Sequence, residues 1–113
     1  MSTSEMEKIP DDMTLTAVAW RAHRYARMQG FWKQYDPISF DTALIKLALI
    51  ASEVGEAIEA VRRGNEAHLA EELADIVVRA CDLAEARSID IEKAVRTKMA
   101  SNEARAYMHG KLA

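Results

Sequence analysis

Two pairs of acidic residues inside apolar stretches constrain the fold of this chain more than any other sequence feature. Glu53 and Glu56 end the stretch LIKLALIASEVGE, and Glu72 and Asp75 begin the stretch ELADIVVRACDLA. A spacing of three residues places both members of a pair on one face of an α-helix. Carboxylates among apolar neighbours are costly unless a positive group meets them. The pattern therefore indicates two facing helices with a divalent metal ion as a candidate partner.

A plainer interpretation of the acids stays open at this point. Acidic residues three positions apart on a helix usually form a solvated face. The apolar surroundings and the duplication of the pair support a metal site without excluding that alternative. Magnesium prefers hard oxygen ligands and commonly bridges to substrate phosphates. A phosphorylated substrate would be repelled by four carboxylates unless metal ions lay between them.

The rest of the chain predicts helices throughout. Half of the residues are hydrophobic but only 6% are aromatic, with four glycines and two prolines, a composition that favours helices. Apolar spacing and capping residues predict four helices: from Asp12 or Thr14 to Gln29, from Ser39 or Asp41 to Arg63, from Glu66 to Arg87, and from Asp90 through Met99. Short connections between them imply an all-α four-helix bundle. The second helix is apolar nearly all round its first half, which predicts burial against a partner.

Length and charge bound the class of protein. We expect a flexible lead-in over residues 1–12 and a single helical domain over residues 13–113. The net charge of −3 argues against a general nucleic-acid or anionic-membrane binder. No signal peptide and no apolar run of membrane-spanning length are apparent. Cys81 is the only cysteine, which fits a reducing compartment. The expected location is the cytoplasm.

The histidines do not match the common redox or zinc patterns. Di-iron and di-manganese bundles use Glu-x-x-His motifs, and no glutamate stands three places before His23, His68 or His109. One cysteine and three scattered histidines give no zinc-ligand pattern either. We expect His68 and His109 to be exposed and Cys81 to be buried.

Taken in order, the motifs resemble those of the MazG-like, all-α nucleoside triphosphate pyrophosphatases, near the dCTP pyrophosphatase-type members. The family signature is ExxE on one helix and ExxD on the next, followed by a GIDL-like segment, here SIDIEKAV at 88–95, and by Lys-x-x-x-Asn-x-x-Arg. The matching residues, within a resemblance that covers about residues 15–111, are Glu53, Glu56, Glu72, Asp75, Lys98, Asn102 and Arg105.

The resemblance implies a four-helix bundle of the MazG-like type that assembles as a homodimer or homotetramer. It implies hydrolysis of a nucleoside triphosphate to the monophosphate and pyrophosphate, with Mg²⁺ as cofactor and Mn²⁺ as an alternative. The substrate is expected to be a canonical or modified deoxynucleotide, in a house-cleaning role. Neither a nucleic acid nor a membrane is expected as a partner.

The resemblance also implies a role for each matching residue. The four acids are expected to hold the metal ions, which polarise the α-phosphate and lower the pKa of the attacking water; Glu53 is our candidate for taking the proton. Lys98 and Arg105 would contact the phosphates, and Asn102 would hydrogen-bond sugar or phosphate.

One departure from the family pattern affects the choice of base. Many members carry a further Glu directly before the first motif, where this chain has Ser52. Glu59 or Glu71 could replace it, although we expect both to be solvated surface charges.

The base-binding residues are suggested by the same resemblance. His23 and Trp32 are similar in kind and separation to the His and Trp that deoxycytidine-triphosphate pyrophosphatases place against the base. An aromatic face stacks on a base and a histidine can hydrogen-bond its edge. The alternative is that Trp32 only covers the open end of the bundle.

Two alternative functions remain after the sequence is read. One is a related enzyme of the same superfamily, a dUTP hydrolase or a phosphoribosyl-ATP pyrophosphatase. The other is a non-catalytic helical dimerisation module whose acids are only surface charges.

Overall fold

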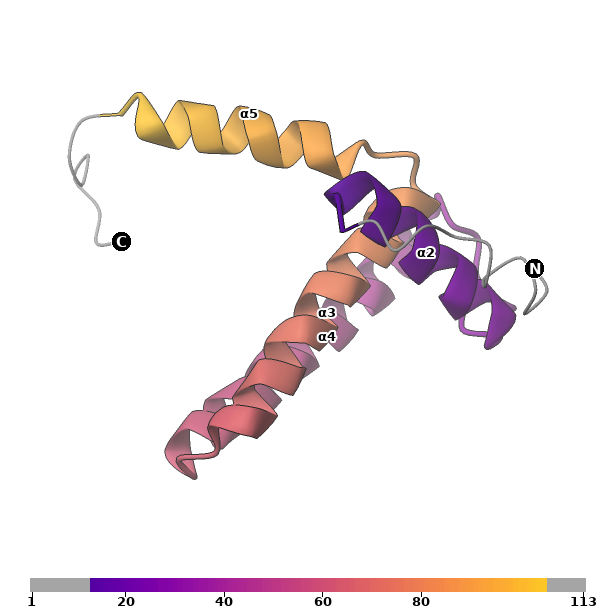
Figure 1. The fold of residues 1–113 in the computed structure, drawn as a ribbon. Helices are drawn as coiled ribbons and strands as arrows, with labels where there is room; N and C mark the ends of the chain where they lie inside the picture. The colour runs from indigo at the N-terminus through magenta and orange to yellow at the C-terminus, as the bar shows by residue number, and fades with distance from the viewer. Residues whose placement is uncertain (1–12, 106–113) are drawn as a thin grey trace.

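The computed structural model describes residues 13–105, which form four α-helices and no strand (Figure 1). The helices are α2 (Leu15–Met28), α3 (Phe40–Arg62), α4 (Glu66–Ala86) and α5 (Ile91–Glu103). The prediction of an all-α fold with four helices is confirmed, with boundaries close to those expected. The predicted lead-in over residues 1–12 lies outside the described residues, so that domain boundary stays a prediction.

Each helix begins at a residue whose side chain caps it. Oxygens of Thr14, Ser39, Asn65 and Asp90 accept hydrogen bonds from the backbone N–H three residues further on, at 3.0–3.2 Å. These bonds satisfy N–H groups that have no partner within the helix. After α2 and α3, Gly30 and Gly64 adopt positive φ angles of 82° and 67°. Glycine accepts this left-handed conformation without steric cost and so ends both helices.

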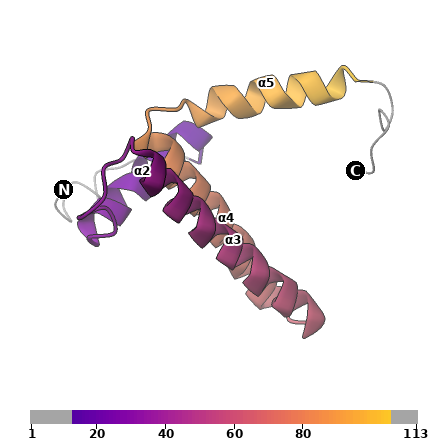
Figure 2. The ribbon, with the colours of Figure 1, turned by 180° about the vertical axis from the view of Figure 1, so that it is seen from behind.

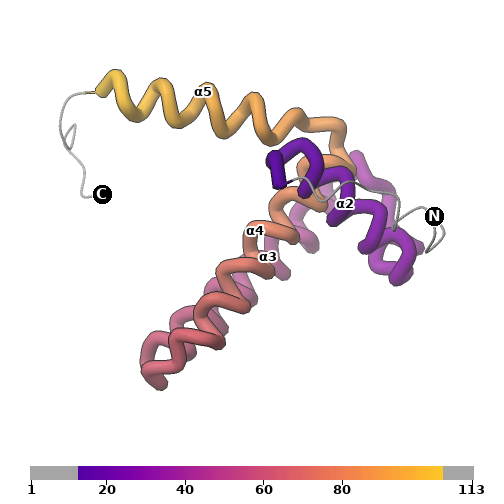
Figure 3. Tube along the Cα trace, viewed as in Figure 1, coloured from indigo at the N-terminus to yellow at the C-terminus, as the bar shows by residue number. Residues whose placement is uncertain are grey.

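The helices α3 and α4 form an antiparallel hairpin and lie side by side along their length (Figures 1 and 2). The helix α2 packs across the open end of this hairpin, mainly against α4. The helix α5 leaves the same end and projects away from the hairpin (Figure 3). The backbone N–H of Thr16 donates a hydrogen bond to the side-chain oxygen Oε1 of Glu92, at 3.4 Å, and joins α2 to the base of α5.

Small side chains make up most of the core of the described chain. Ala19, Ala22, Ala26, Ala57, Ala60 and Ala84 are buried together with Trp32 and Cys81. The predicted burial of Cys81 is confirmed, and burial raises the pKa of its thiol. Large apolar side chains on α3 and α4 instead point outward and are 49–61% exposed: Leu44, Leu47, Ile58, Val61, Leu73 and Val77. Within residues 13–105 of one chain, nothing covers the apolar surface for which the sequence predicts a partner.

Among residues 13–105, no helix is both long and apolar enough to cross a membrane.

Candidate functional site

Five polar side chains follow one face of α4, and we call them the α4 polar stripe: His68, Glu72, Asp75, Arg79 and Asp82. Their spacing of four, three, four and three residues keeps them on the same side of a helix. Their contacts reach α3, α2 and the loop between those two helices. The stripe therefore runs along the inner face of α4, where the helices meet.

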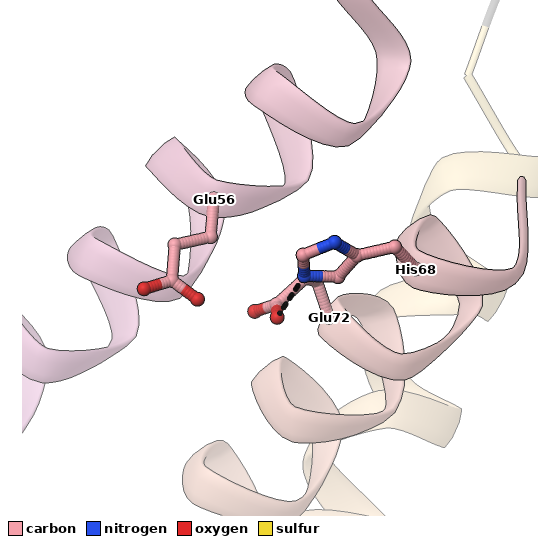
Figure 4. A group of neighbouring side chains, drawn as sticks. All are labelled: Glu56, His68 and Glu72. Carbon is pink, nitrogen blue, oxygen red and sulfur yellow. Dashed lines mark hydrogen bonds and ion pairs between the residues drawn. The ribbon is translucent and has the colours of Figure 1, made fainter. Parts of the chain in front are cut away.

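The acidic residues predicted from the sequence come together in two overlapping groups. Carboxylate oxygens of Glu53, Glu72 and Asp75 all lie within 4.8 Å of one another. Ligand atoms of Glu56, His68 and Glu72 form a second group under the same limit (Figure 4). Glu72 belongs to both groups. The helices α3 and α4 thus place the other three predicted acids around Glu72.

Glu72 shows that these residues fit a cation. The residue is only 5% exposed, and its Oε1 lies 3.0 Å from Nε2 of His68. Its second oxygen, Oε2, is buried and has no hydrogen-bond partner among the described residues. When Glu72 is ionised, a buried carboxylate oxygen without a partner is costly, because that oxygen has lost its contact with water. A divalent ion with hard-oxygen preference would supply the missing interaction.

The protonation of Glu72 reflects the same crowding. The neighbouring Glu53 carboxyl, close enough to share a proton with it, raises the pKa of Glu72 to about 7, from an ordinary value of 4.5. Burial adds to the rise, the charge of Glu56 adds further, and the hydrogen bond with His68 opposes it. Near neutral pH a bound cation would therefore displace a proton from Glu72.

Arg79 places a positive charge of the protein next to the acids. Its Nε lies 3.2 Å from Oε1 of Glu53, whose side chain is 15% exposed. Arg79 stands one helical turn beyond Asp75 on the same face of α4. The guanidinium thus contacts one of the carboxylates proposed as metal ligands and borders the acidic groups on the side of α2.

Asp82 joins the two residues predicted to contact a base. Its Oδ1 lies 2.7 Å from Nδ1 of His23 and accepts a hydrogen bond from Nε1 of Trp32 at 2.9 Å. The Trp32 N–H also lies 3.1 Å from Oδ2. The two rings meet edge to face with centroids 5.3 Å apart, and both residues are buried. The structure therefore brings His23 and Trp32 together, held by an aspartate of α4.

Lys46 covers one face of the Trp32 ring. Its ammonium lies 4.3 Å from the centroid of that ring and 4.8 Å from the centroid of Tyr35. It also donates a hydrogen bond to the Phe31 carbonyl at 2.9 Å. Burial lowers the pKa of Lys46 and the charge of Arg79 adds to this, whereas the charge of Asp82 raises it. A base could stack on this face only after Lys46 moves.

The residues predicted to hold phosphates lie elsewhere in a single chain. Lys98 and Asn102 are exposed on α5, and exposed Arg105 follows the end of that helix. From Glu72 to the end of α4 at Ala86 the helix runs roughly 20 Å, and α5 then projects away from the hairpin (Figure 1). One chain does not bring these three residues to the acidic groups.

Sequence reasoning missed three members of the α4 polar stripe. His68 was expected to be an exposed residue without a role; its side chain is 40% exposed, but its ring also contacts Glu72. Arg79 and Asp82 were not singled out at all. The signal was present, because the spacing of three and four residues continues from the ExxD motif in both directions. The expectation that Glu59 and Glu71 are solvated is confirmed by their exposure.

Comparison with protein-family models gives one match. A model of the MazG nucleotide pyrophosphohydrolase domain matches residues 42–107, more than half of the chain. The matched region contains α3 from residue 42 onward, α4 and α5, with all four acids, whereas His23 and Trp32 precede it. Comparisons with curated proteins and with solved structures find no significant match.

Proposed function

The chain belongs to the MazG nucleotide pyrophosphohydrolase family, a family of hydrolases acting on nucleotide phosphoanhydrides, and we propose that it converts a deoxynucleoside triphosphate to the monophosphate and pyrophosphate. The observation that carries this proposal is the buried, unpartnered Oε2 of Glu72 amid three further carboxylates. In a solvated acidic face, water would satisfy that oxygen. A house-cleaning role toward canonical or modified deoxynucleotides is part of the proposal.

We propose that Glu53, Glu56, Glu72 and Asp75 hold Mg²⁺, with Mn²⁺ as an alternative ion. All four offer carboxylate oxygens from two rigid helices, which suits either ion. A divalent ion bound there supplies positive charge against the phosphates and lowers the pKa of water. Glu53 remains our candidate for accepting the proton of the attacking water, and its ion pair with Arg79 must open before it can do so.

The nucleotide is proposed to lie along the α4 polar stripe. Asp75 and Asp82 are two helical turns apart, about 10 Å, which is comparable with the length of a nucleoside monophosphate. The phosphates would then lie at the Glu72 end, and the base would meet His23 and Trp32 at the Asp82 end. Arg79, between the two ends, has the planar donor fork that suits a phosphate oxygen pair.

We further propose that the chain acts as a homodimer or homotetramer. The exposed apolar side chains of α3 and α4 form a surface larger than scattered single residues would give. The phosphate-binding role proposed for Lys98, Asn102 and Arg105 requires that α5 of one chain lies close to the acidic groups of another chain. Association of identical chains would cover the apolar surface and offers a way for α5 of one copy to approach the acids of another.

Other functions are distinguished by substrate. A dUTP hydrolase or a phosphoribosyl-ATP pyrophosphatase would use the same acids and differ at the base end of the stripe. The family match and the unpartnered Glu72 oxygen favour an enzyme over a helical dimerisation module.

A substrate panel tests the proposal. The chain is incubated with each dNTP, dUTP and phosphoribosyl-ATP in Mg²⁺ and ¹⁸O-labelled water, and pyrophosphate and monophosphate are measured. We expect pyrophosphate release with the label in the monophosphate, because water then attacks the α-phosphorus. Product from phosphoribosyl-ATP alone would favour the biosynthetic alternative. Absence of product from every nucleotide at high enzyme concentration would contradict the proposal.

A further inference from the structure

The imidazole of His68 belongs to the acidic site although no motif marks it. Its Nε2 lies 3.0 Å from Oε1 of Glu72, and the Glu56 carboxylate completes a group of ligand atoms within 4.8 Å. Glu56 extends from α3 toward His68 and Glu72 on α4 (Figure 4). The other group, formed by Glu53, Glu72 and Asp75, contains only oxygen.

The spacing of these atoms suits ligation of one ion. Neighbouring ligands at bond lengths of about 2.1 Å and right angles lie about 3 Å apart, which matches the distance between His68 and Glu72. The wider separation to Glu56 closes with a modest side-chain movement, because Glu56 is exposed. Glu72 is more than nine-tenths buried, and its free Oε2 remains available when Oε1 is engaged. One carboxylate can therefore serve both groups.

Ligand type separates the two positions chemically. Imidazole nitrogen suits first-row transition metals, including zinc, whereas a set of carboxylates suits magnesium, calcium or manganese. An open groove lined by Ser52, Gly55, Glu56, Glu59, Arg63 and His68 leads to the histidine side of the site. An ion can therefore reach this position from solvent without passing the proposed base-binding end.

We propose that Glu56, His68 and Glu72 form a mixed nitrogen and oxygen site for a first-row transition-metal ion, beside an all-oxygen position at Glu53, Glu72 and Asp75. The inference rests on the proposed function, because Glu72 is a ligand of the proposed Mg²⁺ position as well as of the mixed site. It adds that the two positions differ in metal preference and that His68 sets the difference. The competing account is that His68 only orients Glu72 by hydrogen bonding.

Zinc binding to the nucleotide-free chain tests the ligand role directly. Zn²⁺ is added to ¹⁵N-labelled protein without a polyhistidine tag, and the ring nitrogens are followed by long-range ¹H–¹⁵N NMR. We expect Nε2 of His68 to move to the range of metal-bound imidazole while His23 stays unchanged. His23 should not respond, because it is hydrogen-bonded to Asp82, which lies about 15 Å along α4 from Glu72. An unchanged His68 resonance at saturating Zn²⁺ would overturn the proposal without any need for a variant.

Calorimetric titration separates ligation from orientation. In His68→Gln, which keeps a hydrogen-bonding side chain, Zn²⁺ affinity should fall at least about tenfold, while Mg²⁺ affinity should change less than about twofold. In Asp75→Asn, the matched variant of the all-oxygen position, Mg²⁺ affinity should fall and the Zn²⁺ response of His68 should persist. Equal loss of both ions in His68→Gln would mean that His68 acts only through Glu72. Circular dichroism checks that both variants keep their helices.

The two proposals fail separately, because no nucleotide is present in these titrations. A chain that ligates Zn²⁺ through His68 but hydrolyses no nucleotide would support the metal site and contradict the enzyme proposal. A chain that hydrolyses dNTPs with Mg²⁺ while His68 stays free of Zn²⁺ would support the enzyme proposal and contradict the mixed metal site.

Discussion

Nε of Arg79 lies 3.2 Å from Oε1 of Glu53, so the protein places its own cation on a carboxylate that we propose as a metal ligand. The ion pair spans α3 and α4 at the edge of the acidic groups. Glu53 cannot give its full charge to a metal ion while it is held by Arg79. The guanidinium would also be free to meet a phosphate once an ion takes over Glu53.

The first prediction follows from this competition. Arg79→Gln should bind Mg²⁺ more tightly in the absence of nucleotide, by roughly 1.4- to 5-fold, because partly exposed ion pairs contribute about 0.2–1 kcal/mol. The same variant should show a higher KM for the nucleoside triphosphate, because a phosphate contact is lost. Calorimetry and steady-state kinetics measure the two effects. Weaker Mg²⁺ binding in the variant would show that Arg79 supports the metal site instead of competing with it.

The second prediction concerns Glu56, which belongs to the acidic groups but is exposed. Glu56→Gln should lower kcat by at least about a hundredfold, since loss of a direct ligand should exceed the cost of losing an outer hydrogen bond. Helicity and oligomer size should not change, because the exposed side chain adds little to packing. Glu66→Gln, at the exposed start of α4, is the matched control and should keep its activity. Retained Mg²⁺-dependent turnover in Glu56→Gln would contradict the metal assignment.

The third prediction is a pH dependence caused by Glu72. Its pKa is about 7 in the folded chain, against an ordinary value of 4.5. Between these values the folded chain keeps a proton that the unfolded chain has lost, so the metal-free protein loses stability as pH rises from about 4.5 to about 7. Below pH 4.5 the titration of Glu72 does not change the free energy of unfolding, and above pH 7 the loss of stability that it causes stays constant. Urea unfolding in EDTA from pH 4.5 to 8.5 measures the change.

Glu72→Gln isolates this contribution from other titrating groups. The difference in unfolding free energy between the variant and the wild type should grow in favour of the variant through the same window and then level off. Mg²⁺ should stabilise the wild type more at pH 8 than at pH 5.5, because it replaces a proton at low pH and relieves repulsion at high pH. A pH-independent difference between the two proteins would refute a raised pKa at Glu72.

Local sequence signals were sufficient for the helices and the acids. Capping residues such as Ser39 and Asn65 fix where helices begin, and glycines at 30 and 64 fix where they end, because both effects act within a few residues. The acidic pairs could be found for the same reason, since spacing along a helix determines which side chains share a face.

The contacts of the α4 polar stripe depend on how segments distant in sequence pack together. The spacing of residues along one helix does not predict that packing. Asp82 is an ordinary helix aspartate until α2 and the loop bring His23 and Trp32 against it, 59 and 50 residues away in sequence. The same holds for Arg79, whose partner lies on α3. The place of α5 relative to the acids would depend on the proposed assembly of chains, which a single sequence does not specify.

The fourth prediction tests Asp82 as the residue that positions His23 and Trp32. Asp82→Ala should lower the free energy of unfolding by about 2–4 kcal/mol, because two buried donors lose a charged acceptor. Glu85→Ala on the same helix is the control: its 3.5 Å pair with Arg24 is partly exposed and should contribute about 1 kcal/mol or less. Urea unfolding measures both. Equal losses of unfolding free energy in the two variants would show that the hydrogen bonds of Asp82 stabilise the fold no more than a partly exposed ion pair does.

The last prediction concerns Trp32, the proposed stacking partner of the base. Trp32→Ala should raise KM about 5- to 150-fold and flatten the preference among bases, because base stacking contributes about 1–3 kcal/mol. The residue is only 7% exposed, so this variant is also destabilised, and Trp32→Phe is needed beside it to keep an aromatic face. Trp32→Phe should retain most of the affinity and the base preference.

The control is Trp20→Phe, at the half-buried tryptophan that carries Arg24 on its face, and it should alter neither KM nor base preference. If KM and base preference stay at wild-type values in folded Trp32→Ala, then Trp32 only packs the end of the hairpin, as the alternative interpretation of its position holds.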